Sequence, residues 1–217
     1  MDCNWEKYYR RKYQKKYSES NRSLKQMIKG LKICGVSDPE TLNFILNHNH
    51  KPTMIGFITN YEKSKRFVKF EKLKNLINVD KKQINFVSVL VNPNDVILEK
   101  IKDLNFDYYQ LYDVSPNRTK EIKSKFKKKI ITAITISSKD DVVKYKDYSE
   151  ISDIILFDSK GYEKSESFDH SLLNDIPREL NKMIAGNIQI DGISNFKNKN
   201  FIVDLSGALE DQNGKKD

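Results

Sequence analysis

The stretch of sequence that decides the fold is Ile84-Asn85-Phe86-Val87-Ser88-Val89-Leu90-Val91, a mostly apolar run in a highly charged chain. A run of this kind is typical of a strand that is covered on both faces. Similar runs lie before and after it, at intervals of about 25 residues. They span 31–35, 54–59, 108–112, 130–137, 153–158, 182–186 and 201–205. The chain is therefore predicted to hold eight buried strands.

The segments between these runs are polar and carry apolar residues at helical spacing. One stripe consists of Leu42, Ile45 and Leu46, and a second lies within residues 96–104. Strands that alternate with helices indicate parallel βαβ units. Eight such units either close into a barrel or form an open doubly wound sheet, and the spacing alone leaves both folds open.

A barrel built from this chain has to be compact. A typical barrel takes about 250 residues and a small one about 200, whereas 191 residues follow residue 26 here. Only fourteen residues separate Gly186 from Phe201, so we expect a stunted helix between them. Residues 206–217 are all that follow the last run, and we expect the usual eighth helix to be missing.

The composition excludes several classes of protein. The chain has 217 residues, of which 38% are hydrophobic and 32% charged, and its mean hydropathy is −0.68. No apolar run approaches the roughly 18 residues that span a bilayer, and the first residues lack the apolar core of a signal peptide. Cys3 and Cys34 are too few for a disulfide framework. We therefore expect a cytoplasmic protein with no membrane partner.

The positive charge is concentrated near the N-terminus. The chain carries a net charge of +9, and residues 1–26 alone hold eight basic and three acidic groups. Aromatic residues recur at every fourth position from Trp5 to Tyr17, which predicts one face of a helix. Such a face packs on a core or, with basic neighbours, contacts RNA; we expect core packing and no nucleic-acid partner. Residues 1–26 are accordingly interpreted as a helical extension, and 27–217 as the main domain.

Residues with useful chemistry stand where the predicted strands end, which is where barrels place their reacting groups. In chain order they are Cys34, Arg66, Gln110, Asp158 and Asp204. A thiol, a guanidinium and two carboxylates would thus meet on one face. Cys34 also has a plainer interpretation, as a small residue of the core.

Small residues follow the last two predicted strands. They are Gly186, Asn187, Ser206, Gly207 and Ala208. In many barrels the backbone N–H groups of these two loops hold a phosphate. Tight turns favour the same residue types, but two such loops together favour the phosphate site. His48 and His50 have no further ligands nearby in the sequence, so we expect no metal site.

Six motifs in a fixed order carry a resemblance to a known family. They are Lys32-Ile33-Cys34-Gly35-Val36; Gly56-Phe57-Ile58 with Ser64-Lys65-Arg66; Val89-Leu90-Val91-Asn92; Gln110-Leu111; Leu156-Phe157-Asp158; and Asp204-Leu205-Ser206-Gly207-Ala208-Leu209-Glu210 with Gly214-Lys215-Lys216-Asp217. Together they resemble the phosphoribosylanthranilate isomerase family of tryptophan biosynthesis. The family commonly has a His where this chain has Tyr112.

The resemblance implies a fold, a reaction and a set of roles. The fold is an α/β protein, a (βα)8 TIM barrel. The reaction is a cofactor-free Amadori rearrangement of N-(5-phosphoribosyl)anthranilate to 1-(2-carboxyphenylamino)-1-deoxyribulose 5-phosphate. Asp158 would be the general acid and Cys34 the general base, while Arg66 would hold the anthranilate carboxylate. Substrate contacts would also come from Gln110 and Asp204, and the phosphate would lie on Gly186, Asn187, Ser206, Gly207 and Ala208.

A second class of function stays open on the sequence alone. A catalytically silent barrel could use its basic N-terminal helix to bind nucleic acid or a protein partner. The presence of Cys34, Arg66 and Asp158 favours the isomerase. The sequence does not predict an oligomeric state.

Overall fold

The computed structural model describes residues 28–159, 167–196, 199–212 and 215–216. Eight strands occur in this part of the chain, and all pair in parallel. They are β1 (Gly30–Cys34), β2 (Met54–Ile58), β3 (Asn85–Val91), β4 (Tyr108–Tyr112), β5 (Lys129–Ile136), β6 (Ile154–Ser159), β7 (Lys182–Ile184) and β8 (Phe201–Leu205). The predicted strands are confirmed to within a few residues at each end.

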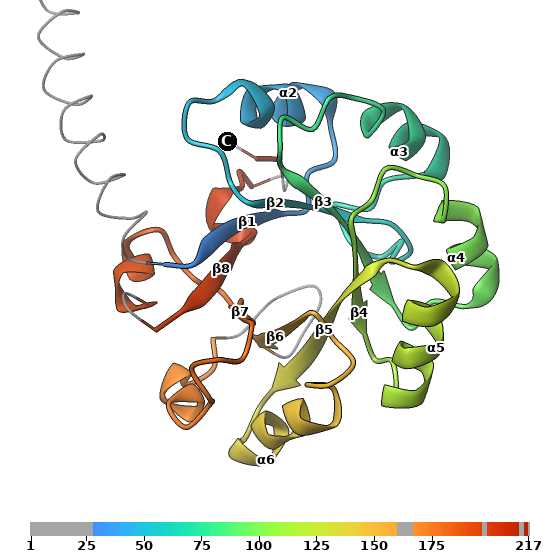
Figure 1. Ribbon diagram of the computed structural model, residues 1–217. Helices are drawn as coiled ribbons and strands as arrows, with labels where there is room; N and C mark the ends of the chain where they lie inside the picture. Colours follow the sequence, from blue (N-terminus) through green and yellow to red (C-terminus); the bar gives the residue numbers. More distant parts are fainter. Residues whose placement is uncertain (1–27, 160–166, 197–198, 213–214, 217) are drawn as a thin grey trace, which may run out of the picture.

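The sheet closes on itself in sequence order, and this closure settles the choice between barrel and open sheet in favour of the barrel. β1 pairs with β2 on one side and with β8 on the other, with Ile33 opposite Leu205. Figure 1 looks into the ring of strands, with the helices arranged around its outside. The chain therefore folds as an α/β, (βα)8 TIM barrel.

The helices that cover the barrel are longer before β5 than after it. The α-helices are α2 (Pro39–Asn47), α3 (Phe70–Leu76), α4 (Asp95–Ile101), α5 (Pro116–Phe126) and α6 (Lys139–Val142). The 3-10 helices are η1 (Val143–Asp147), η2 (His170–Leu173), η3 (Asp191–Phe196) and η4 (Gly207–Leu209). Helices α2 and α5 each begin with a Pro that follows an N-cap residue. The N-cap of α2 is Asp38 and that of α5 is Ser115, and the side chain of each accepts a hydrogen bond from a backbone N–H of the first turn.

Two expectations about the last part of the barrel, from β7 to the C-terminus, are confirmed. The connection from β7 to β8 is the six-residue 3-10 turn η3. After β8, the described residues hold only the three-residue η4 and no α-helix. The predicted helical extension, 1–26, lies outside the described residues. The outward side chains of β1, Leu31 and Ile33, are only partly buried.

Alternation along each strand divides the apolar residues into an inner and an outer set. Inward residues such as Val87, Ile131 and Met183 fill the barrel. Outward residues such as Phe57 and Val203 pack under the helices in two further clusters. The interior of the barrel is therefore filled with side chains.

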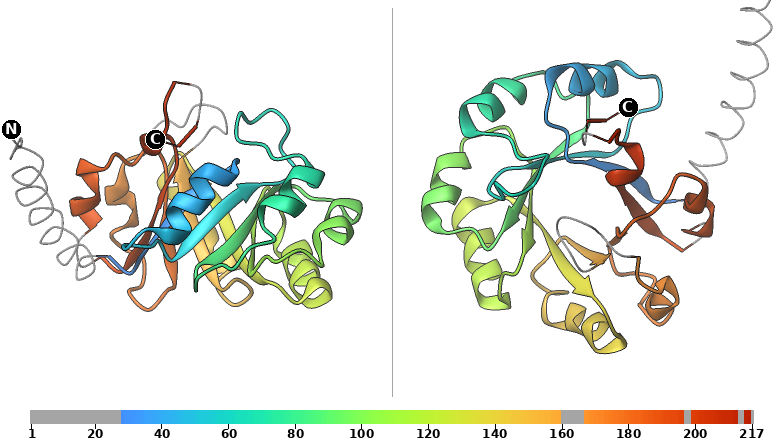
Figure 2. Two further views of the ribbon diagram at one scale, coloured as in Figure 1. Left: turned by 90° about the horizontal axis from the view of Figure 1, so that it is seen from above. Right: turned by 180° about the vertical axis from the view of Figure 1, so that it is seen from behind.

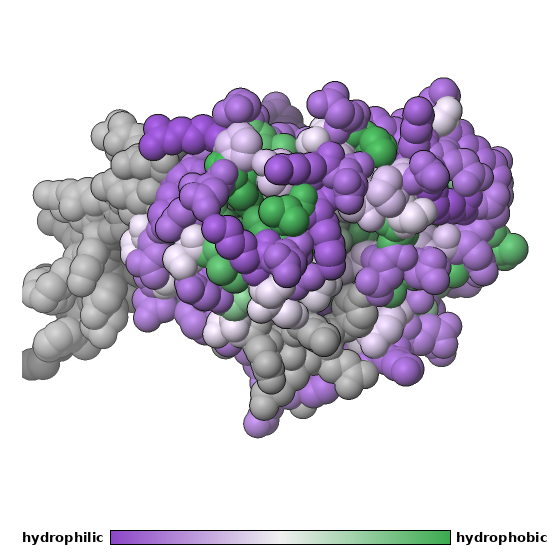
Figure 3. Space-filling view, turned by 90° about the horizontal axis from the view of Figure 1, so that it is seen from below, coloured by the Kyte–Doolittle hydropathy of each residue, from purple (hydrophilic) through white to green (hydrophobic). Residues whose placement is uncertain are grey.

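The outside of the molecule is mostly hydrophilic. Figure 3 shows the side that lies at the bottom of Figure 1, where one group of apolar residues lies near the centre and several separate apolar patches lie to its right, among polar ones. Figure 2 shows the same barrel from above and from behind. None of the helices in the described part of the chain has the length and apolar character that crossing a membrane requires.

Candidate active site

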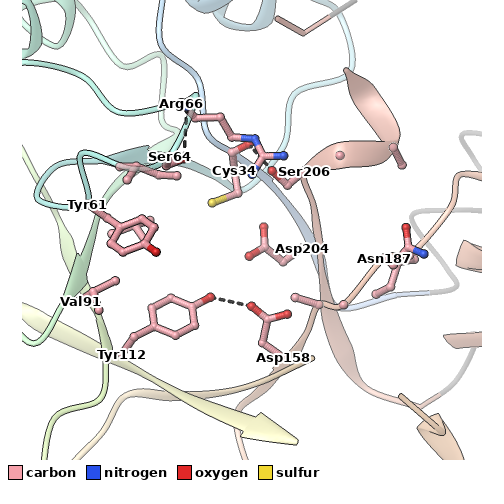
Figure 4. Close-up of a pocket in the computed structure, with 17 residues that line it drawn as sticks. Cys34, Tyr61, Ser64, Arg66, Val91, Tyr112, Asp158, Asn187, Asp204 and Ser206 are labelled. Atoms are coloured by element: carbon pink, nitrogen blue, oxygen red, sulfur yellow. Dashed lines mark hydrogen bonds between the residues drawn. The ribbon is translucent and has the colours of Figure 1, made fainter. Parts of the chain in front are cut away.

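A cavity of about 350 Å³ opens among the C-terminal ends of the strands. Figure 4 shows side chains from β1, β4, β6 and β8 pointing into it. Its walls are formed by Cys34, Ile58, Tyr61, Ser64, Arg66, Val89, Val91, Tyr112, Asp158, Ala185, Gly186, Asn187, Ile188, Asp204, Ser206, Gly207 and Ala208. Nine of the ten residues predicted for the site therefore line one cavity. The tenth, Gln110, is fully buried and lies behind Tyr112.

Cys34 ends β1 and shares the inward face of that strand with Lys32. The Lys32 side chain is fully buried, and its Nζ donates to Asp204 Oδ2 on β8 at 2.8 Å. Burial raises the pKa of the Cys34 thiol above its ordinary value, while the charge of Lys32 acts to lower it. The thiol thus lies beside a cation that favours its reactive, deprotonated form.

Asp158 reaches the cavity from β6 and has a hydrogen bond on each oxygen. The Tyr112 hydroxyl donates to Oδ2 at 2.7 Å, and the backbone N–H of Ser159 donates to Oδ1 at 2.8 Å. Gln110 Nε2 in turn donates to the Tyr112 hydroxyl at 3.1 Å. Burial outweighs these bonds and raises the pKa of Asp158 to about 6. Its carboxyl can therefore carry a proton near neutral pH.

Arg66 lies at the rim of the cavity and is held by the C-terminal segment. Its Nε and Nη2 donate to the two carboxylate oxygens of Glu210, each at 2.6 Å. Lys216 bonds to the same carboxylate and also donates to Ser206 O at 3.0 Å. Gly35, at φ 83°, makes room for this arrangement, because a Cβ there would lie 2.4 Å from Arg66 Cδ. Two cations therefore share Glu210 beside the cavity.

The predicted phosphate residues come together from β7 and β8. Gly186 has φ 95° and Asn187 φ 53°, so the chain turns sharply after β7. The Ser206 hydroxyl donates to Cys34 O at 3.1 Å and ties the loop after β8 to the end of β1. Residues of both loops line the cavity.

Sequence reasoning missed three charged residues of this site. Lys32 precedes Cys34 by two positions, and that spacing on a strand was the available signal for a shared face. Glu210 and Lys216 were quoted within a motif but received no role. Glu210 lies 144 residues from Arg66, and only the fold brings the two together.

Comparison with known proteins identifies one family along most of the chain. Residues 31–217 match the family model of N-(5'phosphoribosyl)anthranilate (PRA) isomerase. The N-(5'-phosphoribosyl)anthranilate isomerase of Zymomonas mobilis subsp. pomaceae is 32% identical over 197 residues, covering 86% of this chain and 91% of that protein. The Rhizobium leguminosarum bv. trifolii protein of the same name is 30% identical, with 86% and 87% covered.

Two solved structures have the same fold as this chain. Phosphoribosyl anthranilate isomerase from Thermotoga maritima has a TM-score of 0.70 and 25% identity, with 86% of this chain and 92% of that chain covered. A phosphoribosyl anthranilate isomerase solved with reduced 1-(o-carboxyphenylamino)-1-deoxyribulose 5-phosphate also has a TM-score of 0.70, at 24% identity, with 86% and 91% covered. The chain belongs to the N-(5'-phosphoribosyl)anthranilate isomerase family.

Proposed function

We propose that this chain isomerises N-(5-phosphoribosyl)anthranilate to 1-(2-carboxyphenylamino)-1-deoxyribulose 5-phosphate, a step of tryptophan biosynthesis, with Asp158 as acid and Cys34 as base. One observation carries the assignment of roles. A carboxyl with a pKa raised to about 6 and a thiol beside a buried lysine line the same cavity. The reaction needs one proton donor and one proton acceptor on the same sugar, and these two side chains supply them.

Ring opening is the step assigned to Asp158. The protonated carboxyl gives its proton to the furanose oxygen as the bond from C1′ to that oxygen breaks. The nitrogen lone pair forms the C1′–N double bond, which yields a Schiff base. With a pKa of about 6, roughly one Asp158 in ten is protonated at pH 7. The acid form is therefore available at a working pH.

Proton transfer at C2′ is the step assigned to Cys34. The thiolate takes the C2′ proton, and the electron pair left behind forms the C1′–C2′ double bond of an enol. At the same time the π bond between C1′ and nitrogen breaks, and its electrons return to the nitrogen as a lone pair. A proton then adds at C1′ while the C2′ hydroxyl loses its proton and becomes the carbonyl. No electrons are gained or lost, so the whole sequence is an isomerisation.

The remaining residues of the cavity suit the two ends of this substrate. Arg66 offers its guanidinium to the anthranilate carboxylate, and Nη1 has no hydrogen bond to the described residues. Planar guanidinium groups match carboxylates well. The backbone of Gly186, Asn187, Ser206, Gly207 and Ala208 would hold the phosphate. Asp204 has one oxygen, Oδ1, that is buried without a hydrogen bond to the described residues, so it can accept one from a substrate hydroxyl.

Variants of the two proposed catalytic residues test this function. Cys34→Ser and Asp158→Asn should each lower kcat for the rearrangement by about 10²–10⁴, the usual contribution of one proton-transfer group. Cys3→Ser and Asp175→Asn are matched controls, since Cys3 is the other cysteine and the Asp175 side chain is 83% exposed. Normal turnover by either active-site variant would remove that residue from its role.

A further inference from the structure

Lys32 is a buried charge that the proposed mechanism leaves unused. Its side chain has no exposed surface, and it points into the barrel from the middle of β1. Burying an ammonium group is costly unless the group is paired and hydrogen-bonded. An apolar residue would fill this place in the barrel at less cost, so the charge itself calls for an explanation.

The surroundings of Lys32 connect it with Cys34. A Cβ placed on Gly56, the neighbour on β2, would lie 3.0 Å from both Cys34 Sγ and Lys32 Nζ. The absence of a side chain at Gly56 therefore leaves a space that both the thiol and the ammonium group border. The charge of Lys32 acts to lower the pKa of Cys34, against the effect of burial.

Asp204 holds the ammonium group from the other side. Only its Oδ2 bonds to Lys32, at 2.8 Å, and its Oδ1 is buried without a partner among the described residues. An ammonium group has three hydrogens, so one can point to Asp204 and another to Cys34. Asp204 thus fixes the position of Lys32 and competes with Cys34 for its charge.

We propose that Lys32 is the positioning residue of the base: its ammonium group stabilises the thiolate of Cys34 against the cost of burial, and Asp204 orients that group and moderates its effect. The inference rests on the proposed role of Cys34 as base. It explains why a lysine, and not an apolar residue, stands two positions before Cys34 on the same strand face.

Other charged and titratable groups also face Cys34. They are Asp204 on β8, Lys216 in the C-terminal segment, Arg66 after β2 and Tyr112 on β4. Lys216 and Arg66 are both hydrogen-bonded to Glu210, whereas Lys32 Nζ and Cys34 Sγ border the same space beside Gly56. Lys32 should therefore have a larger effect on the thiol than either of them.

The proposal is tested by measuring the pKa of Cys34 from the ultraviolet absorbance of its thiolate as the pH is raised. All variants carry Cys3→Ser, so that Cys34 is the one cysteine that titrates. Lys32→Met should raise the pKa of Cys34 by about one unit or more, which is a tenfold loss of thiolate below that pKa. Asp204→Asn should lower it, because the competing carboxylate is gone. Lys182→Met is the matched control: Lys182 is also buried, but its Nζ bonds to Pro177 O away from the cavity.

A double variant keeps the test decisive if Lys32→Met fails to fold. Lys32→Met leaves Asp204 buried without its cation, whereas Lys32→Met with Asp204→Asn removes both charges. The double variant should have a higher Cys34 pKa than Asp204→Asn alone. An unchanged pKa in this comparison, or an equal shift in Lys216→Met, would overturn the proposal. The titration needs no turnover, so its outcome is separate from that of the proposed reaction. An active Cys34→Ser protein would refute the role of Cys34 as base. The effect of Lys32 on the pKa of Cys34 would still be measured by the titration.

Discussion

At the scale of single residues, Asp158 combines a role in chemistry with a cost in stability. Its pKa is about 6 in the folded protein and near 3.8 in an unfolded chain. Below about pH 3 the carboxyl is mostly protonated in both states, and Asp158 then has little effect on the free energy of unfolding. As the pH rises towards 6 the unfolded chain releases its proton first, and the folded protein loses up to about 3 kcal/mol of stability.

Asp158→Asn should remove this dependence on pH, since an amide does not titrate. We expect the stability of the variant relative to the natural protein to increase between about pH 4 and pH 6 and then to level off. Urea unfolding of the two proteins across this range measures the difference. A constant difference would mean that Asp158 ionises in the folded protein as easily as in the unfolded chain.

Arg66 provides a second prediction at this scale. Arg66→Ala should chiefly raise KM, because a contact that is equal in the ground and transition states affects binding alone. Arg66→Lys should recover only part of the affinity, since a lysine cannot form the two parallel bonds to a carboxylate. Steady-state kinetics of both variants give the result, with Arg118→Ala, at a surface ion pair with Asp95 and Glu121, as the control. Full recovery by lysine would show that the geometry of the guanidinium is unimportant.

At the scale of elements, the link after β1 is shaped by a glycine. Gly35 has φ 83°, and a Cβ there would meet Arg66 Cδ. Gly35→Ala should therefore cost about 1 kcal/mol or more in stability and raise KM by displacing Arg66. Gly192→Ala in η3 is the matched control, because a Cβ there has nothing within 4 Å. Unfolding and kinetic measurements on both variants compare the two sites, and equal behaviour would contradict the assigned role of Gly35.

The strands could be predicted from the sequence, whereas contacts between distant segments could not. Strands such as Tyr108–Tyr112 and Phe201–Leu205 were predicted at their observed bounds because both faces are buried and the apolar run is continuous. Cys34 and Asp158 followed from their places at strand ends and from the family motifs. The bidentate contact from Arg66 to Glu210 could not be predicted, because its geometry depends on how the last residues fold over the barrel. The bond from Tyr112 to Asp158 likewise depends on closure, which brings β4 and β6 to the same cavity.

At the scale of the whole molecule, the barrel closes at a place where its outer layer is thin. β1 pairs with β8, yet no α-helix follows β8 in the described part of the chain. The outward residues Leu31 and Ile33 of β1 are only partly buried. In an eight-fold barrel a helix packs at this position and runs from the C-terminal ends of the strands back to their N-terminal ends. A helix placed directly before β1 would run in the same direction and end where β1 begins.

Residues 1–26 are therefore predicted to supply the missing cover as a substitute for the eighth helix. Removing them should cost roughly 1–2 kcal/mol, the value of covering two partly exposed apolar side chains, and should favour aggregation. Urea unfolding of the shortened and full chains measures this loss. A helix over residues 5–27 would be about 34 Å long, more than the barrel needs, so removal of residues 1–9 should have little effect and is the control. If the chain without residues 1–26 is as stable and as active as the full chain, the segment is an appendage and β1 needs no cover from it.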